Sequence, residues 1–407
     1  MSLSIRHSAG VIRALATAAG FSLATAYGQQ LDIHCIDVGQ GSSELFIGPD
    51  GTTVLVDGGG KSEGQAHLLP YLNSIFPEGK RAFDYLIASH DDNDHVGGLN
   101  VILSNGYQAG TIYNNGVSDN FGRGVAMPLG TTIPLGNGAV MTCVKVYTSV
   151  IDGTELDVNP GNDNGLSIVL LVEYGDFDYI TGGDLGQKEE PDVAQALISY
   201  VNPPSHPYHP NATFLDSAYG VEVLHPNHHA GRSSTCASYV NILKPEFAII
   251  NGGTGYSDPT KYAVDRLLGR ERYTIDPSCS GGGSSGDLTG VTWHGLVAIY
   301  RTTYGDQTDC ARATEQDCPV AGNVFISTDG RSYCIEGTYL PLICRTTDEA
   351  PTPTPTITPT PTVTPTPTPW IFPRRVNFQP SGSSSSGWFC ADDGSDYGTC
   401  GDFGWVN

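Results

Sequence analysis

The sequence has few basic residues and no long apolar run. No apolar run among its 407 residues reaches the ~18 that a membrane-spanning helix needs, so we expect no integral membrane segment. Lysine and arginine number 20 against 43 acidic residues, which gives a formal net charge of −23 at pH 7. So acidic a chain is a poor candidate for a protein that grips nucleic acid by neutralising phosphates along its surface. Hydrophobic residues, at 39%, are still enough for a large core, which excludes global disorder.

The ten cysteines contain no C-x-x-C spacing, which argues against a zinc finger or a redox dithiol. Their number is even, as in proteins whose cysteines pair in disulfides. We expect pairing within two groups: Cys310, Cys318, Cys334 and Cys344 in one segment, and Cys390 with Cys400 near the end.

The first 26 residues have the pattern of a secretory signal peptide. They carry Arg6, His7 and Arg13 but no acid, and an apolar stretch over residues 14–26 ends in Ala-Thr-Ala. A positive start, a short apolar centre and an A-x-A end are the three parts of such a signal. The alternative is a buried N-terminal helix, which the small residues and the lack of acids disfavour. We therefore expect a secreted, extracellular protein in which disulfides form.

A nearly strict Thr-Pro alternation over residues 351–369 divides the chain. Such a run favours an extended polyproline II spacer. It separates a body, residues 31–345, from a tail, residues 370–407, that is too short for a core of its own. The tail resembles the opening of a β-sandwich module, here truncated, and a disordered end is the alternative. A tail of this kind would serve for attachment to a cell surface or a polysaccharide.

Within the body, short apolar runs alternate with helical stretches, which predicts a layered α/β fold. The expected strands are Leu31–Ile36, Thr52–Val56, Phe83–Ala88, Ser167–Glu173, Phe177–Thr181, Val221–Leu224, Phe247–Ile250 and Leu296–Tyr300. The expected helices are Gly64–Ile75, Gly98–Ser104, Glu189–Tyr200, Thr235–Leu243 and Thr260–Leu268. Asp57, His90, Asp184 and His228 follow expected strand ends, directly or within a few residues. Layered α/β folds place their sites beyond strand ends, so these side chains are candidates for one site.

The strongest motif is SHDDNDHVGG at residues 89–98, which follows an expected strand directly. It holds four potential metal ligands within six residues: His90, Asp92, Asp94 and His95. Side chains two residues apart in an extended segment face the same way, so His90 and Asp92 can reach one ion. A tight turn at the two glycines would start the helix and aim Asp94 and His95 at a second ion. A solvated acidic loop would not explain histidines that bracket alternate acids, so the motif predicts metal binding.

Distant residues complete the predicted site. Asp184, in Thr-Gly-Gly-Asp after an expected strand, can bridge two ions held the ~3.5–4 Å apart that two-metal hydrolysis uses. His228 and His229 follow another expected strand, and adjacent histidines point in different directions. We expect one to bind a metal and the other to face substrate or solvent; we assign the metal to His228 and leave the reverse open. Asp57 is expected to brace a turn near the metals.

His90-x-Asp92-x-Asp94-His95 resembles the H-x-H-x-D-H signature of the metallo-β-lactamase superfamily. Aspartate at the second position is similar to the branch that contains the extracellular domain of the DNA-uptake channel protein ComEC. Further landmarks of that branch follow in order over residues 31–340, among them IDVGQG at 36–41, VDGG at 56–59, NGLSIVL at 164–170 and TGGD at 181–184. The resemblance implies a four-layer αββα sandwich with the metals at one edge.

The chain departs from the family pattern in three places. The histidine pair is followed by Ala-Gly at 230–231, where the family often has Gly-Ser. Asp258, in Tyr-Ser-Asp-Pro, stands where the family has a histidine. No histidine lies between His95 and Asp184 to act as the middle ligand of many members. The candidates near that point are Asn162, Asp163 and Asn164. One metal site is therefore expected to be weaker or to fill in a substrate-dependent way.

The resemblance also implies a mechanism. Two divalent cations would generate a bridging hydroxide near neutral pH, which would attack phosphorus or a carbonyl carbon. We expect zinc, with manganese as the alternative because carboxylates are prominent in the ligand set. The expected metal ligands are His90, Asp92, Asp94, His95, Asp184 and His228. The residues expected to take part in catalysis are Asp94, His229 and Asp258, the last two as candidates to protonate the leaving group.

Three functions remain open at this point. The first is a secreted phosphodiesterase that acts on nucleic acid, against which the net charge of −23 counts. The second is a metal-dependent hydrolase of esters, lactones or amides, since a fold does not settle a substrate. The third is a non-catalytic surface binding protein, which would not need the ligand set to be complete.

Overall fold

The computed structural model describes residues 30–76, 81–117, 119–159, 161–202, 220–231, 233–252, 258–269, 291–303 and 318–347. The expected signal peptide, Thr-Pro spacer and tail lie outside these residues, as do Cys279, Cys310, Cys390 and Cys400. Among the described residues, no helix has both the length and the apolar character needed to span a bilayer.

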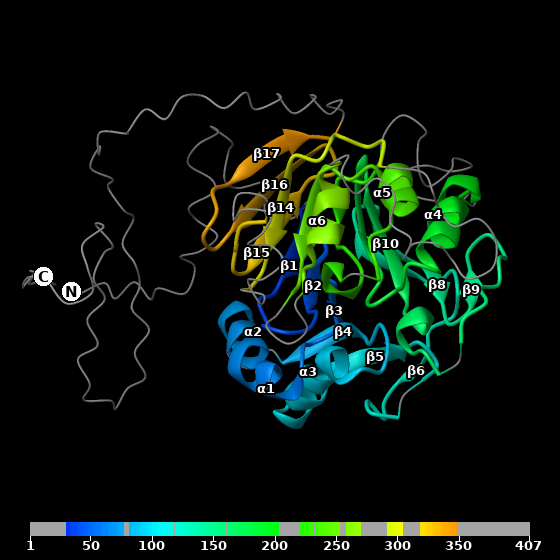
Figure 1. Ribbon diagram of the computed structural model, residues 1–407. Coiled ribbons are helices and arrows are strands. Elements are labelled where there is room, and N and C mark those ends of the chain that lie inside the picture. The colour runs from blue at the N-terminus through cyan, green and yellow to red at the C-terminus, as the bar shows by residue number, and fades with distance from the viewer. Residues whose placement is uncertain are drawn as a thin grey trace, which may run out of the picture. The chain divides into compact units, whose positions relative to one another are not determined.

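Two β-sheets form the centre of the described unit (Figure 1). The first sheet has nine strands, in the order β17 (Ile343–Thr346), β16 (Ser332–Gly337), β15 (Val324–Thr328), β1 (Leu31–Cys35), β2 (Glu44–Ile47), β3 (Thr53–Val56), β4 (Ala82–Ile87), β5 (Gln108–Asn114) and β6 (Val125–Ala126). The second has eight, in the order β14 (Ala298–Arg301), β13 (Phe247–Ile250), β12 (Val223–Leu224), β11 (Phe177–Thr181), β10 (Val169–Tyr174), β8 (Ala139–Val146) and β7 (Thr132–Gly136), with β9 (Ser149–Val150) paired to β8.

Helices cover the outer face of each sheet. Against the first sheet lie α1 (Lys61–Glu63), the π-helical η2 (Gly64–Leu68), α2 (Leu69–Ile75) and α3 (Asn93–Ser104). Against the second lie α4 (Glu190–Ser199), α5 (Ala237–Leu243) and α6 (Lys261–Leu267). Two short 3-10 turns, η3 (Asn164–Leu166) and η4 (His228–Ala230), stand between strands and helices.

Three apolar cores hold these layers together. The middle core joins the two sheets through buried side chains such as Phe46 and Phe177. Leu72 and Leu99 pack the first group of helices onto their sheet, and Leu197 and Val240 pack the second group onto theirs. The predicted four-layer αββα sandwich of the metallo-β-lactamase type is therefore confirmed.

The expected elements are present in the described residues, with one informative error. The strands Phe177–Thr181 and Phe247–Ile250 match β11 and β13 residue for residue. The helix expected to begin at Gly98 begins at Asn93 instead, so both glycines of the motif lie inside α3. Close packing rather than a turn explains why glycine is needed here, because a Cβ on Gly98 would lie 1.8 Å from the carbonyl oxygen of Gly58.

Strand direction brings the candidate ligands to one edge. Strands β11, β12 and β13 are parallel, as are β3 and β4, so their carboxyl ends point the same way within each sheet. Asp184 follows β11, His228 follows β12, and His90 follows β4. The motif at 89–98 and the histidine pair at 228–229 thus meet where the two sheets face each other.

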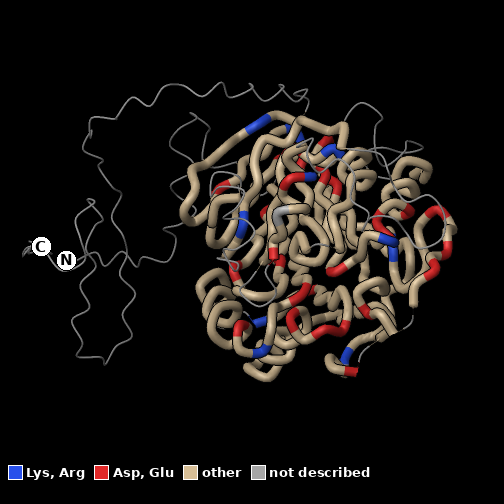
Figure 2. The backbone as a smooth tube through the Cα atoms, viewed as in Figure 1, with Lys and Arg blue, Asp and Glu red and all other residues tan. Residues whose placement is uncertain are grey.

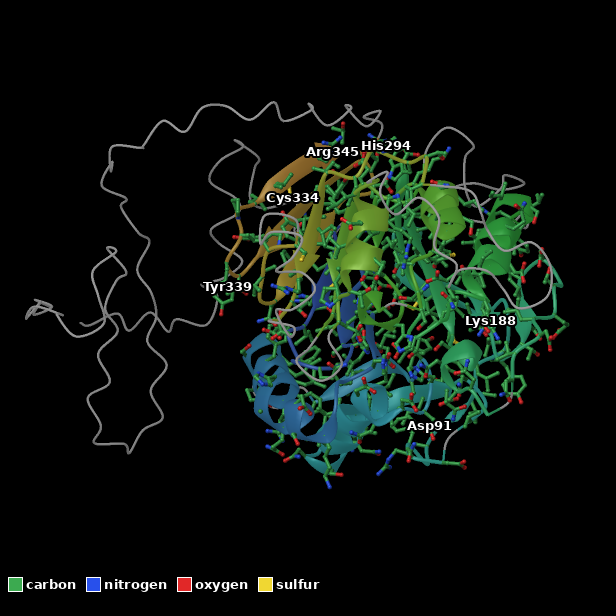
Figure 3. The ribbon with its side chains drawn as sticks, viewed as in Figure 1. Asp91, Lys188, His294, Cys334, Tyr339 and Arg345 are labelled. Atoms are coloured by element: carbon green, nitrogen blue, oxygen red, sulfur yellow. A yellow bond between two sulfur atoms is a disulfide. The ribbon has the colours of Figure 1, made fainter. Side chains whose placement is uncertain are left out.

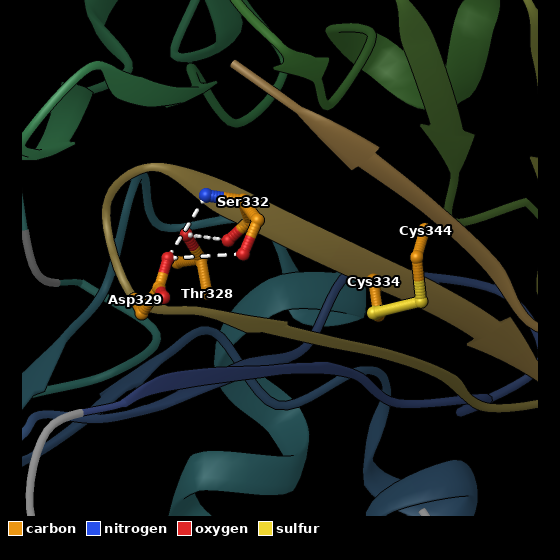
Figure 4. The surroundings of a disulfide bond; sticks show 5 residues. All are labelled: Thr328, Asp329, Ser332, Cys334 and Cys344. Atoms are coloured by element: carbon orange, nitrogen blue, oxygen red, sulfur yellow. Dashed lines mark hydrogen bonds between the residues drawn. A yellow bond between two sulfur atoms is a disulfide. The ribbon is translucent and has the colours of Figure 1, made fainter. Parts of the chain in front are cut away.

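One disulfide lies far from that edge. Cys334 on β16 and Cys344 on β17 face each other across neighbouring strands and are bonded (Figure 4). At the turn of the β15–β16 hairpin, the carboxylate of Asp329 accepts hydrogen bonds from the backbone N–H and the hydroxyl of Ser332. The pair falls within the cysteine group expected to bond internally, and this bond ties the edge strand to its neighbour.

Candidate metal centre

Asp184 lies at the middle of the site and is almost fully buried. Its Oδ1 lies 3.1 Å from His95 Nε2 and 3.5 Å from His229 Nε2. Its Oδ2 lies 3.9 Å from His90 Nε2 and 3.7 Å from His228 Nε2. Each carboxylate oxygen therefore faces two imidazoles, which divides the site into two halves that share one aspartate.

The half around Oδ1, which we call the buried half, consists of Asp94, His95, His229 and Asp184. One ligand atom from each of these four residues lies within 4.8 Å of all the others. His229 Nε2 is also 3.3 Å from Asp94 Oδ2. Two nitrogens and two oxygens at this spacing match the donors and coordination number that zinc accepts.

The half around Oδ2, which we call the open half, consists of His90, Asp92, His228 and Asp184. His90 Nε2 lies 3.6 Å from Asp92 Oδ2, and that carboxylate side chain is 49% exposed. The His228 side chain is 29% exposed, against 5% for Asp184. The open half thus has longer distances between its ligand atoms and more contact with solvent than the buried half.

Outer hydrogen bonds turn the imidazoles so that Nε2 faces the centre. His95 Nδ1 lies 2.7 Å from Asp57 Oδ2, and His229 Nδ1 donates to the carbonyl oxygen of Asn251 at 2.6 Å. His90 Nδ1 lies 3.1 Å from the hydroxyl of Ser89. Partners of this kind fix the tautomer and orientation of metal-binding histidines. The prediction that Asp57 braces the site rather than binds metal agrees with this contact.

The inward-facing atoms lack hydrogen-bond partners. Nε2 of His90, His95 and His229 and Oδ1 of Asp184 are all buried, and none has a hydrogen bond of acceptable geometry within the described residues. Several orphaned polar atoms aimed at one point are expensive unless something fills the space between them. Divalent cations satisfy nitrogen and carboxylate donors together, so the residues present fit the metal pair that the motif predicts.

The charges at the site are already arranged for cations. Burial alone would raise the pKa of Asp184, but the positive field of His229 and His95 holds it well below its usual range. Burial likewise opposes charge on His95, yet Asp184 and Asp57 raise its pKa well above the usual histidine value. The carboxylate is therefore ionised over the ordinary pH range, which is the form that binds metal, whereas His95 must release its proton when a cation takes its place.

The turn that carries the histidine pair has an uncommon backbone. His228, His229 and Ala230 all have left-handed conformations, with φ of 51°, 53° and 55°. Non-glycine residues rarely adopt this region singly, and here three do so in succession. The result is that adjacent histidines reach opposite oxygens of one carboxylate. His229, which the sequence makes a candidate to protonate the leaving group, lies in the buried half, and His228 lies in the open half.

Of the three residues considered for the missing middle ligand, Asn164 contacts the cluster. Its Nδ2 is 3.4 Å from His228 Nε2. Asp163 points elsewhere, since its carboxylate accepts from the backbone N–H of Asp91 at 2.6 Å and from Asn115 Nδ2 at 3.1 Å.

Asp258 lies next to the histidine turn and is buried. A Cβ on Gly231 would lie 3.3 Å from its Oδ1. Its role as a proton donor stays a prediction. Arg232, Tyr256 and Ser257, which flank these positions in the chain, lie outside the described residues.

Residues 36–115 match the Metallo-beta-lactamase superfamily, and this span contains the whole H-x-D-x-D-H motif. The resemblance to this superfamily is confirmed. ComE operon protein 3 of Bacillus subtilis is 27% identical over 268 residues, which are 60% of this chain and 31% of that protein. Recombination protein 2 of Haemophilus influenzae is 27% identical over 263 residues, 61% of this chain and 28% of that protein.

The chain thus spans about a third of the length of the curated relatives it matches. Among solved structures, a diphosphatase from the PhnP family aligns with 14% identity over 55% of this chain and 87% of its own, at a TM-score of 0.31.

Proposed function

We propose that the protein is a secreted hydrolase that works with two divalent cations, one in each half of the centre described above. The observation that carries the proposal is the set of buried nitrogen and oxygen atoms that converge around Asp184 without a hydrogen bond. The buried half would hold one ion through Asp94, His95 and His229, and the open half a second through His90, Asp92 and His228. We propose zinc for both, and the carboxylate-rich ligand set makes manganese the alternative.

A cation pair of this kind lowers the pKa of bound water and stabilises negative charge that develops on the substrate. The chain's own residues prepare the site for it. Asp57, Asn251 and Ser89 keep the imidazole Nε2 atoms directed inward. The exposure of Asp92 and His228 leaves the open half accessible, so we place the substrate there.

For the substrate we propose a phosphodiester of nucleic acid. The support is the likeness to Recombination protein 2, which carries a DNA process in its name. The objection is charge: Figure 2 shows acidic segments over most of the described unit and few basic ones, and the whole chain carries −23. That charge favours a neutral ester, lactone or amide as the second candidate, because the acidic surface would repel a polyanion everywhere except close to the cations.

The test is a panel of substrates offered to the purified full chain. Single-stranded DNA, plasmid DNA, a chromogenic phosphodiester, an ester, a lactone and a β-lactam would each be tested with zinc, with manganese and with chelator. We expect DNA cleavage that chelator abolishes and added metal restores. Asp94→Asn should be inactive, which excludes a contaminating nuclease, and Asp192→Asn, an exposed change of the same kind, should be fully active.

The other outcomes separate the alternatives. Turnover of a neutral substrate with no cleavage of DNA would replace the phosphodiesterase with the second candidate. Binding of two metal ions with no turnover of any substrate would point to a non-catalytic binding protein. Extracellular location is tested separately, by whether the protein expressed in a host with its first 26 residues reaches the medium and loses them.

A further inference from the structure

The left-handed turn at His228–Ala230 needs outside support. A run of non-glycine residues in this backbone region persists only where surrounding contacts dictate it. Thr235, five residues later, is also left-handed, with φ of 57°. The histidine loop, described over residues 227–231 and 233–236, therefore has left-handed backbone at two points. The first of these points presents one histidine to each half of the centre.

Backbone hydrogen bonds hold part of this loop. The N–H of His228 donates to the carbonyl of Gly183 at 2.9 Å, and the N–H of Ala230 donates to the carbonyl of Asn227 at 3.0 Å. Ser234 Oγ donates to that same carbonyl of Asn227 at 2.7 Å. The first bond ties the turn to the segment after β11, and the other two close the turn on itself. On α6, Arg266 donates from Nε to the carbonyl of Thr235 at 2.6 Å and from Nη2 to the carbonyl of Ser234 at 2.7 Å.

Glu190, on the first turn of α4, connects the loop to that helix. Its side chain is fully buried. Oε1 accepts from Asn227 Nδ2 at 2.9 Å and from the N–H of Thr235 at 2.7 Å. Oε2 accepts from the N–H of Cys236 at 2.7 Å. A single carboxylate thus binds both ends of the histidine loop, one at Asn227 and the other at Thr235–Cys236.

We propose that Glu190 is a positioning residue of the metal centre: its bonds to both ends of the histidine loop set the loop so that His228 and His229 face opposite oxygens of Asp184. Glu190 touches neither imidazole and acts only through the loop. The inference rests on the proposed cation pair. Three donors converge on Glu190, and a carboxylate is the side chain that only accepts, so a neutral amide of the same shape cannot replace it.

The experiment compares Glu190→Gln with Asp192→Asn, which removes a charge from the exposed face of the same helix turn. Metal-free full-length protein is titrated with cobalt(II), which accepts the same nitrogen and oxygen ligands as zinc, in competition with a chelator. We expect both cobalt ions to bind Glu190→Gln about 10–100-fold more weakly, the usual cost of losing an outer partner, with a shifted visible absorption spectrum. Asp192→Asn should match the wild type in both readouts.

Cobalt affinities and a spectrum in Glu190→Gln equal to those of the wild type would overturn the proposal, whatever the loss in thermal stability. If Glu190→Gln does not fold, Asn227→Ala takes its place, since it removes one of the three donors and leaves the carboxylate. We expect this variant to weaken cobalt binding as well, and wild-type binding in it would overturn the proposal. The cobalt titration contains no substrate, so it tests the role of Glu190 independently of hydrolysis. A wild-type protein that binds cobalt but hydrolyses none of the substrates would overturn the proposed function and leave the role of Glu190 standing.

Discussion

The two ends of the parallel strands β11, β12 and β13 both gather buried carboxylates, with opposite partners. At the carboxyl end, Asp184 faces four imidazoles. At the amino end, Asp178 begins β11 while Glu222 and Glu246 precede β12 and β13. The two ends are well separated: Figure 3 shows Asp91, from the metal motif, and Arg345, which pairs with Glu246, on opposite sides of the unit.

At the amino end the acids lie close enough to one another for their charges to interact. The backbone N–H of Asp178 donates to Glu222 Oε2 at 2.6 Å. Glu246 has a cation and a phenol as partners, since Arg345 Nε lies 3.1 Å from its Oε2 and the hydroxyl of Tyr333 donates to the same oxygen. Burial, then the nearby charge of Glu173 and Glu222, raises the pKa of Asp178 well above the usual range. Burial and the charges of Glu246 and Asp176 do the same to Glu222.

The comparison shows that burial alone does not decide what a carboxylate does. The pKa of Asp184 is lowered and that of Asp178 is raised, although burial pushes both pKa values upward. The two residues belong to the same strand region: Asp178 lies in β11, and Asp184 follows the end of β11. The difference lies in the partners: histidines stabilise the anion that binds cations, whereas other acids favour the protonated form. The carboxylate at the carboxyl end of the strands is therefore held in its ionised form, and Asp178 and Glu222 at the amino end are held in their protonated form.

The largest expected effect comes from Asp184→Asn, set against Asp178→Asn at the other end of β11. Because Asp184 faces both halves, its loss should weaken the binding of both metal ions by more than about 100-fold. This exceeds the 10–100-fold loss of affinity that follows the removal of an outer hydrogen-bond partner. Asp178→Asn mimics a protonated acid and should keep two metal ions per chain. Metal content after gel filtration, measured by atomic emission, distinguishes the two. Equal metal content in both variants would contradict the comparison.

A smaller effect separates the two halves of the metal centre. The buried half has the shorter distances and excludes solvent, so the first zinc ion should bind there and the second more weakly in the open half. His95→Gln should then remove the tight phase of a calorimetric zinc titration. His90→Gln should remove the weak phase and leave the tight one. If His90→Gln abolished the tight phase, the order of the two halves would be reversed.

Sequence alone predicted much of this edge because its signals are local. The alternation of histidines and aspartates over 90–95 and the short apolar run before Asp184 are visible without a structure. Strands such as β8 and β5 were not expected, since an evenly buried run like Ala139–Val146 lacks the alternation that marks a strand. The start of α3 was misplaced because glycine is usually a helix breaker, and only its contact with the backbone of Gly58 explains it here.

The role of the histidine pair could not be derived in the same way. Adjacent side chains diverge in ordinary backbone, and the sequence carries no sign that residues 228–230 turn left-handed. Glu190 gave no signal either, because an acid after a helix start is common for reasons of helix capping. Its importance depends on donors 37, 45 and 46 residues away in the chain, which only the packing of α4 against the loop brings together.

The smallest expected effect is on stability, and it tests the acids at the amino end of β11, β12 and β13. Carboxyls whose pKa is raised in the folded protein hold protons that the unfolded chain releases, so stability is greatest below the ordinary carboxyl pKa and falls as pH rises through the raised values. The free energy of unfolding should therefore decline with rising pH, at up to about 1.4 kcal/mol per pH unit for each proton held. Glu222→Gln should flatten this decline, because the amide accepts the hydrogen bond from Asp178 and has no proton to lose. Urea unfolding in chelator across the acidic and neutral range measures it, with Glu336→Gln, exposed on β16, as the control. Parallel curves for the wild type and Glu222→Gln would show that the acids at this end are ionised like those at the other.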